Sequence, residues 1–231
     1  MNALVEIKDM SKIYNPGENE VRALDHVSLS IGEKEFVTII GQSGSGKSTL
    51  MNMLGCLDTP TSGKYFLHGQ DVSDLSDNEL SDIRNQEIGF IFQGFNLIAG
   101  LSALENVELP LIYRGVGRSE RNRLAKEALS KVGLSDRITH KPSEMSGGQQ
   151  QRVAIARAIA QAPPIILADE PTGNLDSAST KEIMQILHSL HEEGRTIILI
   201  THDPEIAAEA KRVVKIMDGK IISDLKNEES V

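Results

Sequence analysis

Alternating and continuous apolar stretches along the chain predict two kinds of β-strand. Residues 4–8 and 27–31 alternate between apolar and polar side chains, as half-exposed strands do. Because both precede the first continuous apolar run, they favour an antiparallel β layer placed before a parallel core. Residues 65–70 predict a further edge strand, and residues 213–217 and 220–222 flank an Asp-Gly turn as a hairpin. Continuous apolar runs, typical of buried strands, occupy residues 36–40, 88–92, 165–168 and 196–200.

Helical patterns occupy the segments between these strands. Apolar residues recur on one helical face over 119–132, where Gly133 follows, and over 177–190. Further helices are expected at residues 50–54, after the capping pattern Ser76–Glu79, at 104–111, from Ser146 to about Ala162, and after Asp203-Pro204. The alternation predicts an α/β fold with a mostly parallel sheet, an N-terminal antiparallel β layer and an inserted helical subdomain at about residues 94–162.

Composition is that of an ordinary globular protein, and it narrows the range of partners. The 231 residues are 39% hydrophobic and 25% charged, and a net charge of −9 argues against nucleic-acid binding. The single cysteine, Cys56, lies among apolar residues and fits a buried side chain in a reduced, cytosolic setting. No apolar run approaches the roughly 18 residues that span a bilayer, and the charged N-terminus is unlike a signal peptide. We therefore expect a soluble chain whose membrane function, if any, requires another chain.

One stretch, GQSGSGKST at 41–49, fits the phosphate-loop pattern G-x-x-x-x-G-K-[ST]. It lies between a predicted buried strand and a helix, where backbone N–H groups converge on an anion at the helix N-terminus. Lys47 is expected to reach the β- and γ-phosphates, and the Ser48 hydroxyl to bind Mg²⁺. The alternative is a chance glycine turn, which is rare at a usual glycine content of about 7%. The expected nucleotide-binding residues are Gly41, Ser43, Gly44, Ser45, Gly46, Lys47, Ser48 and Thr49.

Polar residues stand at the ends of three other predicted buried strands: Gln93, Asp169-Glu170 and His202. Ligands of open parallel sheets bind beyond the carboxyl ends of the strands, so these side chains are expected around one nucleotide. Asp169 suits a carboxylate that holds Mg²⁺, and Glu170 suits a general base toward water attacking the γ-phosphate. The alternatives are a capping acidic pair for Asp169-Glu170, a solvated strand end for Gln93 and a turn histidine for His202.

The segment MSGGQQQRVAIAR, from Met145 to Arg157, resembles the signature segment of ABC-transporter ATPases. The family usually has Leu in place of Met145, a change that conserves volume. The resemblance covers the whole chain, and the signature distinguishes this class from other phosphate-loop NTPases. It implies a single ABC ATPase domain over 1–231, in which residues 1–93 and 163–231 form the P-loop NTPase core and the β layer.

The same resemblance implies roles for residues outside the phosphate loop. Tyr14 matches the aromatic residue that stacks on adenine, although an edge-strand aromatic without a ligand explains it equally well on its residues alone. Asn174-Leu-Asp176 matches the D-loop, and His202 matches the switch histidine that stabilises the γ-phosphate. Gln93 matches the Q-loop glutamine, which touches the Mg²⁺ and water shell. The implied catalytic residues are Glu170, His202, Gln93 and Lys47, and the implied Mg²⁺ site consists of Ser48, Gln93 and Asp169.

Members of this family bind ATP in a head-to-tail dimer, in which the signature of one subunit faces the phosphate loop of the other. The resemblance therefore implies an ATP-dependent homodimer of this chain. It also implies that the signature residues act on the nucleotide of the partner subunit, namely Ser146, Gly147, Gly148 and Gln149.

Residues 55–63, 106–111 and 168–176 resemble the lipoprotein-release and macrolide-export branch of the family (LolD and MacB). ATPases of that branch, which also serves antimicrobial-peptide resistance, pair with an integral membrane permease that has a large extracytoplasmic domain. The resemblance implies a cytoplasmic chain held on the inner face of the cell membrane by its permease, with no nucleic-acid partner.

Two other functions stay open at this point. A soluble ABC-type ATPase acting on DNA or the ribosome would have no membrane partner, but such forms generally carry a long coiled-coil insertion or two fused ATPase units. A regulatory nucleotide-binding module would show little turnover, which the joint presence of Glu170, His202 and Gln93 disfavours. Co-purification of a membrane protein separates the first alternative from a transporter subunit, and steady-state turnover separates the second.

Overall fold

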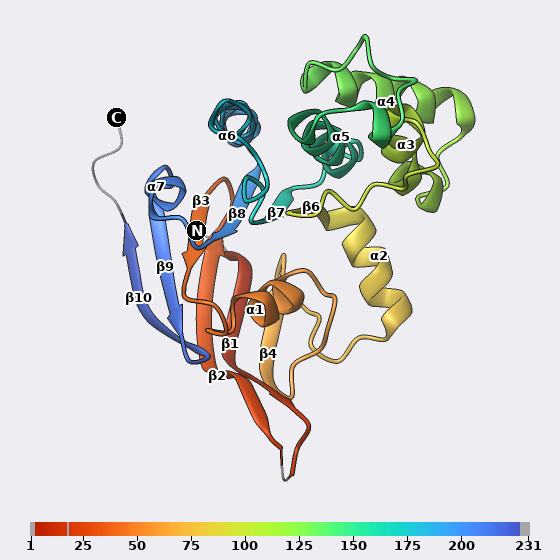
Figure 1. The fold of residues 1–231 in the computed structure, drawn as a ribbon. Coiled ribbons are helices and arrows are strands. Elements are labelled where there is room, and N and C mark those ends of the chain that lie inside the picture. Colours follow the sequence, from red (N-terminus) through yellow and green to blue (C-terminus); the bar gives the residue numbers. More distant parts are fainter. Residues whose placement is uncertain (1–2, 18, 227–231) are drawn as a thin grey trace. The chain divides into compact units, whose positions relative to one another are not determined.

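The computed structural model describes residues 3–17 and 19–226, and the chain forms two compact units. Unit 1 comprises residues 1–84 and 196–231, and unit 2 comprises residues 85–195. Helix α2 (Asp77–Glu87) contains the boundary between them. Figure 1 shows the elements of both units, coloured along the chain.

Unit 1 contains the antiparallel layer that the alternating segments predict. Its strands follow the order β2-β1-β4-β5, and all three pairings are antiparallel. Strands β1 and β2 are longer than predicted, because Asp9 and His26 adopt left-handed φ angles of 48° and 53° near register shifts and interrupt the alternation. The bounds are β1 (Ala3–Tyr14), β2 (Val21–Gly32), β4 (Ser62–Leu67) and β5 (Gln70–Asp71).

A second group of strands in unit 1 carries the predicted parallel core. Strand β3 pairs in parallel with β8 on one side and β9 on the other, and β9 continues into β10 as the predicted antiparallel hairpin. Ile39, Ile197 and Val214 are fully buried, so these strands are apolar on their inward faces. The bounds are β3 (Phe36–Ile40), α1 (Lys47–Leu54), β8 (Thr196–Thr201), α7 (Pro204–Ala208), β9 (Arg212–Met217) and β10 (Lys220–Lys226).

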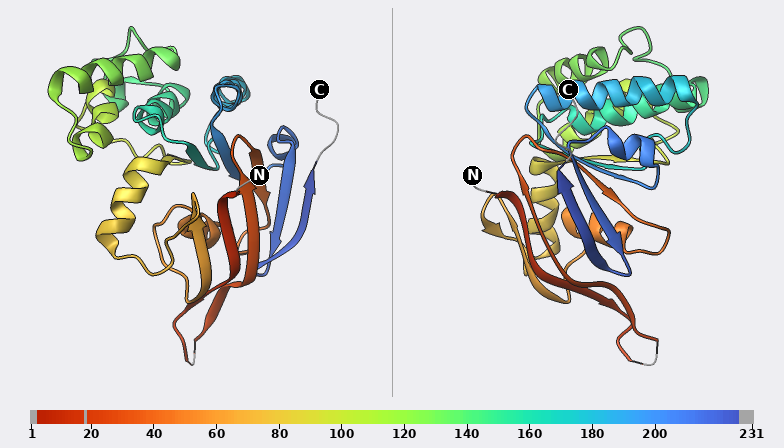
Figure 2. Two further views of the ribbon diagram at one scale, coloured as in Figure 1. Left: turned by 180° about the vertical axis from the view of Figure 1, so that it is seen from behind. Right: turned by 90° about the vertical axis from the view of Figure 1, so that its left-hand side faces the viewer.

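Unit 2 combines one parallel strand pair with a group of helices. Strand β6 (Ile88–Phe92) pairs in parallel with β7 (Ile165–Asp169). Helices α3 and α4 both pack against α5, as the green elements in both views of Figure 2 show. The helices are α3 (Ala103–Tyr113), α4 (Arg118–Lys131), the 3-10 turn η1 (Pro142–Glu144), α5 (Gly147–Ile159) and α6 (Ser177–Glu192).

Two predicted helices differ in extent from the observed ones. Helix α3 begins earlier than residue 104 because Ser102 and Glu105 form a reciprocal capping box, and it includes Pro110 near its end. Helix α5 ends at Ile159 rather than near Ala162, because Ala162 has a left-handed φ of 55° before the two prolines. The predicted α/β class with an antiparallel β layer is confirmed. None of the helices in the described ranges is long and apolar enough to span a bilayer.

Candidate functional site

In unit 1, residues 41–46 connect β3 to α1 as a tight loop whose glycines are required by space and by backbone angle. Gly44 and Gly46 have φ angles of +78° and +102°. A Cβ atom on Gly46 would lie 2.5 Å from the carbonyl oxygen of Ala23, and one on Gly41 would lie 2.4 Å from that of Ile216. Space therefore excludes a side chain at Gly41 and Gly46, whereas at Gly44 a side chain has room and only the backbone angle disfavours it.

The loop also holds a buried hydroxyl group and a cation. Ser45 is 4% exposed, and its Oγ has no hydrogen-bond partner in the structure. The Lys47 ammonium donates to the carbonyl oxygens of Gly41 (2.6 Å) and Gln42 (2.8 Å). An unpaired buried hydroxyl costs free energy unless a polar ligand or water reaches it. Together with the glycine backbone and the start of α1, this chemistry fits an anionic phosphate group.

Within each unit, one pair of predicted site residues follows two neighbouring parallel strands. In unit 1, Ile40 pairs with Thr201, so Gly41 and His202 follow adjacent strand ends. Phe92 and Asp169 are paired in unit 2, so Gln93 and Glu170 also follow adjacent strand ends. Each unit therefore has two of the predicted polar positions after neighbouring strand ends.

Two structural features set the chain direction at the ends of β8 and β7. After His202, the Asp203 carboxylate accepts hydrogen bonds from the N–H groups of Glu205 and Ile206, so the predicted cap of α7 is confirmed. Glu170 has a left-handed φ of 46°, a conformation that costs free energy in a residue with a side chain. Strain of this kind concentrates at sites where a side chain must take a fixed direction.

Tyr14, at the end of β1, takes part in a polar cluster beside the phosphate loop. Its hydroxyl donates to Asp58 (2.9 Å), and the Lys12 ammonium lies 5.0 Å from its ring centroid. Burial, followed by the bond to Asp58, raises the pKa of Tyr14, so the hydroxyl stays protonated. Sequence reasoning missed Lys12 and Asp58, although the spacing of Lys12 and Tyr14 along one strand was a usable signal.

Helix α5 begins with a closed polar cap in unit 2. Ser146 Oγ accepts a hydrogen bond from Gln149 N (3.3 Å), and Gln149 Oε1 accepts one from Ser146 N (3.0 Å). Gly148 faces α6, where a Cβ atom would lie 2.5 Å from Ser179 Oγ. Gly147 is more open, since a Cβ there would meet its nearest atom, from Leu175, at 3.5 Å. The packing therefore leaves no space for a side chain at Gly148, whereas Gly147 has space for one.

Two polar side chains of α5 hold the neighbouring loops of unit 2. Gln151 is fully buried and donates to the carbonyl oxygen of Pro171 (2.6 Å), directly after Glu170. Arg157 donates to the carbonyl oxygens of Asn96 (2.5 Å) and Phe95 (2.9 Å), shortly after Gln93. Sequence reasoning missed this role of both residues. The signal available was the placement of polar residues on either side of the apolar run 153–156.

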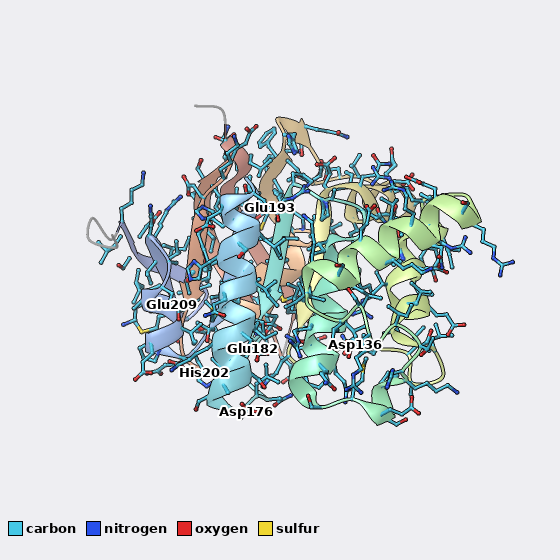
Figure 3. The ribbon with its side chains drawn as sticks, turned by 90° about the horizontal axis from the view of Figure 1, so that it is seen from above. Asp136, Asp176, Glu182, Glu193, His202 and Glu209 are labelled. Carbon is cyan, nitrogen blue, oxygen red and sulfur yellow. The ribbon has the colours of Figure 1, made fainter. Side chains whose placement is uncertain are left out.

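Asp176, the residue directly before α6, is the N-cap of that helix. Its carboxylate accepts hydrogen bonds from Ala178 N (3.0 Å) and from the N–H (2.9 Å) and hydroxyl (3.1 Å) groups of Ser179. The backbone bond from Ser179, followed by its hydroxyl, lowers the pKa of Asp176 and keeps it ionised. Figure 3 shows Asp176 at the start of α6, Glu182 within the helix and Glu193 at its far end, where it is the C-cap. Among the described residues, no group of three or more His, Cys, Asp and Glu side chains is arranged to hold a metal ion.

Comparison with known proteins identifies the family. The family described as ABC transporter matches residues 24–173. The macrolide export ATP-binding/permease protein MacB of Hyphomonas neptunium is 57% identical over 98% of this chain, and an uncharacterised ABC transporter ATP-binding protein of Thermotoga maritima is 54% identical over 96% of this chain and 94% of its own length. The chain belongs to the ABC-transporter family. It is an ATPase cassette of that family, as the signature segment predicts.

Solved structures of ABC cassettes have the same fold. The dimeric structure of MJ0796, a bacterial ABC transporter cassette, superposes with a TM-score of 0.90 at 48% identity, covering 98% of this chain and 100% of that one. A second structure of MJ0796, a post-hydrolysis state bound to ADP and Pi, gives 0.89 at 48% identity. The predicted P-loop NTPase fold class is confirmed by this likeness.

The length of this ABC cassette differs from that of its MacB relatives. The chain spans 35% of the Hyphomonas neptunium protein and 34% of the MacB of Mannheimia succiniciproducens. The family match includes the phosphate loop, Gln93 and the signature segment, whereas Tyr14, Asp176 and His202 lie outside the matched residues.

Proposed function

We propose that this ABC cassette binds ATP with Mg²⁺, hydrolyses it in a head-to-tail homodimer and drives a separate membrane permease. The observation that carries the proposal is the phosphate loop, in which a buried, unpartnered Ser45 hydroxyl and Lys47 lie beside Gly41 and Gly46, two positions with no room for a Cβ atom. Such a loop binds a polyphosphate through backbone N–H groups and one point charge.

The phosphate-binding part of the site comprises the loop and its metal ligands. Lys47 exchanges its two carbonyl contacts for the β- and γ-phosphates, while Gly41, Ser43, Gly44, Ser45, Gly46, Ser48 and Thr49 surround them. Ser48, Gln93 and Asp169 would hold Mg²⁺, and the ion, when bound, supplies positive charge that neutralises the phosphates. Tyr14 stacks on the adenine ring.

The catalytic part of the site uses a base and two polar side chains. Glu170 takes the proton of the attacking water as general base, which contributes about 10² to 10⁴ in rate. Gln93 orients that water, and His202 stabilises the charge of the γ-phosphate. Gln151, through Pro171, holds the loop after Glu170 in a fixed conformation.

The signature end of α5 completes the nucleotide site of a second copy. Ser146, Gly147, Gly148 and Gln149 stand at the N-terminus of a 13-residue helix, where N–H groups and the helix dipole favour an anion. Asp176 starts α6 beside Gly148 and lies at the same dimer surface. The dimeric structures of MJ0796 support self-association of this kind.

We propose a permease partner of the macrolide-export or lipoprotein-release type, with a large extracytoplasmic domain. Identity of 57% to a chain that carries both an ATP-binding part and a permease supports this choice. The cassette then works at the cytoplasmic face of the cell membrane. As an ABC ATPase domain, it divides into a core and β layer of residues 1–93 and 163–231 and a helical subdomain at about 94–162.

Light scattering of the Glu170→Gln variant with and without ATP tests the proposal. The amide cannot accept the proton, so ATP binds and persists, and the mass is expected to rise from about 25 kDa to twice that value. Adding Ser146→Arg to the same variant serves as the control, since it blocks the dimer surface but leaves the monomer's phosphate loop intact. An ATP-bound protein that stays monomeric in both backgrounds contradicts the homodimer.

A further inference from the structure

The chain that leaves α1 is fastened to the end of β1 in unit 1. The backbone N–H of Ile13 donates to Thr61 Oγ1 (3.0 Å), and the N–H of Thr61 donates to the carbonyl oxygen of Ser11 (2.9 Å). Asp58 lies three residues before Thr61 and four after the end of α1. These bonds hold Asp58 next to Tyr14, although 44 positions separate the two residues.

Asp58 is the acceptor on which this cluster depends. Its carboxylate receives hydrogen bonds from the Tyr14 hydroxyl (2.9 Å), the Lys12 ammonium (2.6 Å) and the N–H of Thr59 (2.7 Å). Burial by itself raises the pKa of Asp58, but the bonds from Lys12, Thr59 and Tyr14 outweigh it and hold the pKa below its ordinary value. The carboxylate is therefore ionised at neutral pH, and Lys12 balances its charge.

The Lys12 side chain, like that of Asp58, is held by more than one hydrogen bond. Its side chain is 12% exposed, and its ammonium also donates to the carbonyl oxygen of Thr59 (2.7 Å). From this position the ammonium lies 5.0 Å from the centroid of the Tyr14 ring, which is within cation–π distance. One face of the ring is thus occupied by the cation, and a planar group stacks only on the other face.

The Tyr14 hydroxyl ties the ring to the segment that follows α1. It donates to Asp58, which lies four residues beyond the end of the helix that the phosphate loop leads into. A ring held at its hydroxyl and covered on one face is restricted in its orientation. Stacking on a ring that is already fixed costs less side-chain conformational entropy than stacking on a mobile ring, which binding would have to order.

We propose that Lys12 and Asp58 are positioning residues for the base of the bound nucleotide. They fix Tyr14 so that it offers one face to a purine at a set distance from the phosphate loop. The inference rests on the proposed ATP site and deepens it.

The test compares a ligand that has a base with one that has none. Dissociation constants for ATP and for inorganic tripolyphosphate are measured with Mg²⁺ by calorimetry on the full chain and on Lys12→Met, which keeps the apolar stem and removes the charge. ATP binding is expected to weaken by about threefold to tenfold, as the loss of a partly buried cation–π contact predicts. Tripolyphosphate binding is expected to change by less than about twofold in the same variant, because the phosphate loop is untouched.

A matched control is present in the same antiparallel layer. The Lys8 ammonium lies 4.8 Å from the ring centroid of Phe66 and pairs with Glu6 (2.9 Å), which reproduces the chemistry of Lys12 away from the phosphate-loop motif. Lys8→Met is expected to leave both dissociation constants unchanged. Lys12→Arg, which restores a cation, is expected to recover most of the ATP affinity.

Tyr14→Phe keeps the ring and removes the hydroxyl. In this second variant too, the affinity for ATP is expected to fall more than the affinity for tripolyphosphate. An equal loss of affinity for both ligands in Lys12→Met and Tyr14→Phe overturns the inference, because it indicates a general distortion of the loop. Unchanged affinity for both ligands overturns it as well. A wild-type chain that binds neither ATP nor tripolyphosphate contradicts the proposed function itself, and this outcome is distinct from the other two.

Discussion

Gln93 and Asn174 are joined by two hydrogen bonds, although 81 positions separate them. The Asn174 amide donates to the main-chain carbonyl of Gln93 (3.1 Å), and the Gln93 amide donates to Asn174 Oδ1 (3.4 Å). At the adjacent Gly173, a Cβ atom would lie 2.6 Å from Gln93 Nε2. The loop after Glu170 therefore fixes the direction of a glutamine that follows a neighbouring strand.

Asn174→Ala is expected to lower the rate of ATP hydrolysis by about tenfold, the effect of losing one to two hydrogen bonds that orient Gln93. The affinity for ATP is expected to change little, because Gln93 acts mainly on water and metal in the proposed site. Steady-state turnover and a binding isotherm separate these two quantities. The exposed Asn78 of α2 provides the control, since Asn78→Ala touches neither loop. Parent turnover in Asn174→Ala would contradict the orienting role.

Lys47→Ala is expected to weaken the binding of both ATP and inorganic tripolyphosphate by tenfold or more, because it removes the only point charge of the phosphate-loop motif. This pattern differs from that of the Lys12 variants, which affect ATP alone. Calorimetry on the purified chain measures both constants. Lys131→Ala, which removes a lysine paired with Glu193 (2.6 Å) on the surface, is the control for a general loss of positive charge. Equal affinities in Lys47→Ala and the parent would exclude Lys47 from phosphate binding.

Gly148→Ala is expected to lower the free energy of unfolding by about 1–3 kcal/mol, because the added Cβ would lie 2.5 Å from Ser179 Oγ and 2.9 Å from Ser179 Cβ. Gly147→Ala provides the comparison, since its Cβ meets ordinary contacts and alanine favours a helix. Denaturant unfolding of the two variants measures the difference. If both variants are as stable as the parent, close packing between α5 and α6 does not require Gly148.

Cys56 is expected to react slowly with thiol reagents in the native protein. The side chain is 1% exposed, and burial raises its pKa to about 11. A raised thiol pKa favours the protonated form, so at pH 8 only about 0.1% is the reactive thiolate, and the fraction rises as the pH approaches 11. Absorbance with a disulfide reagent at pH 8 follows the reaction, with the denatured chain as the fully reactive reference. Rapid stoichiometric labelling of the native chain would contradict the burial of Cys56.

Local patterns in the sequence were enough to predict most elements of the fold. The apolar runs at 36–40 and 88–92 coincide with β3 and β6, and the run at 196–200 falls one residue short of β8. Buried strands and the phosphate loop are both marked by residues that are close together in the sequence. They can therefore be recognised from the sequence alone. The bulges of β1 and β2 were missed, because backbone angles at Asp9 and His26 depend on the paired strand.

The sequence by itself determined the family, the phosphate loop and the polar residues that follow the buried strands, because each of these is a short pattern of residue types. Only the tertiary structure decided what holds those residues in place. Asp58 reaches Tyr14 across 44 positions, Arg157 reaches Phe95 across 62, and Asn174 reaches Gln93 across 81. Hydrogen bonds over such separations leave no periodic pattern in a single sequence, since they depend on where the packing of whole strands and helices places each pair of side chains.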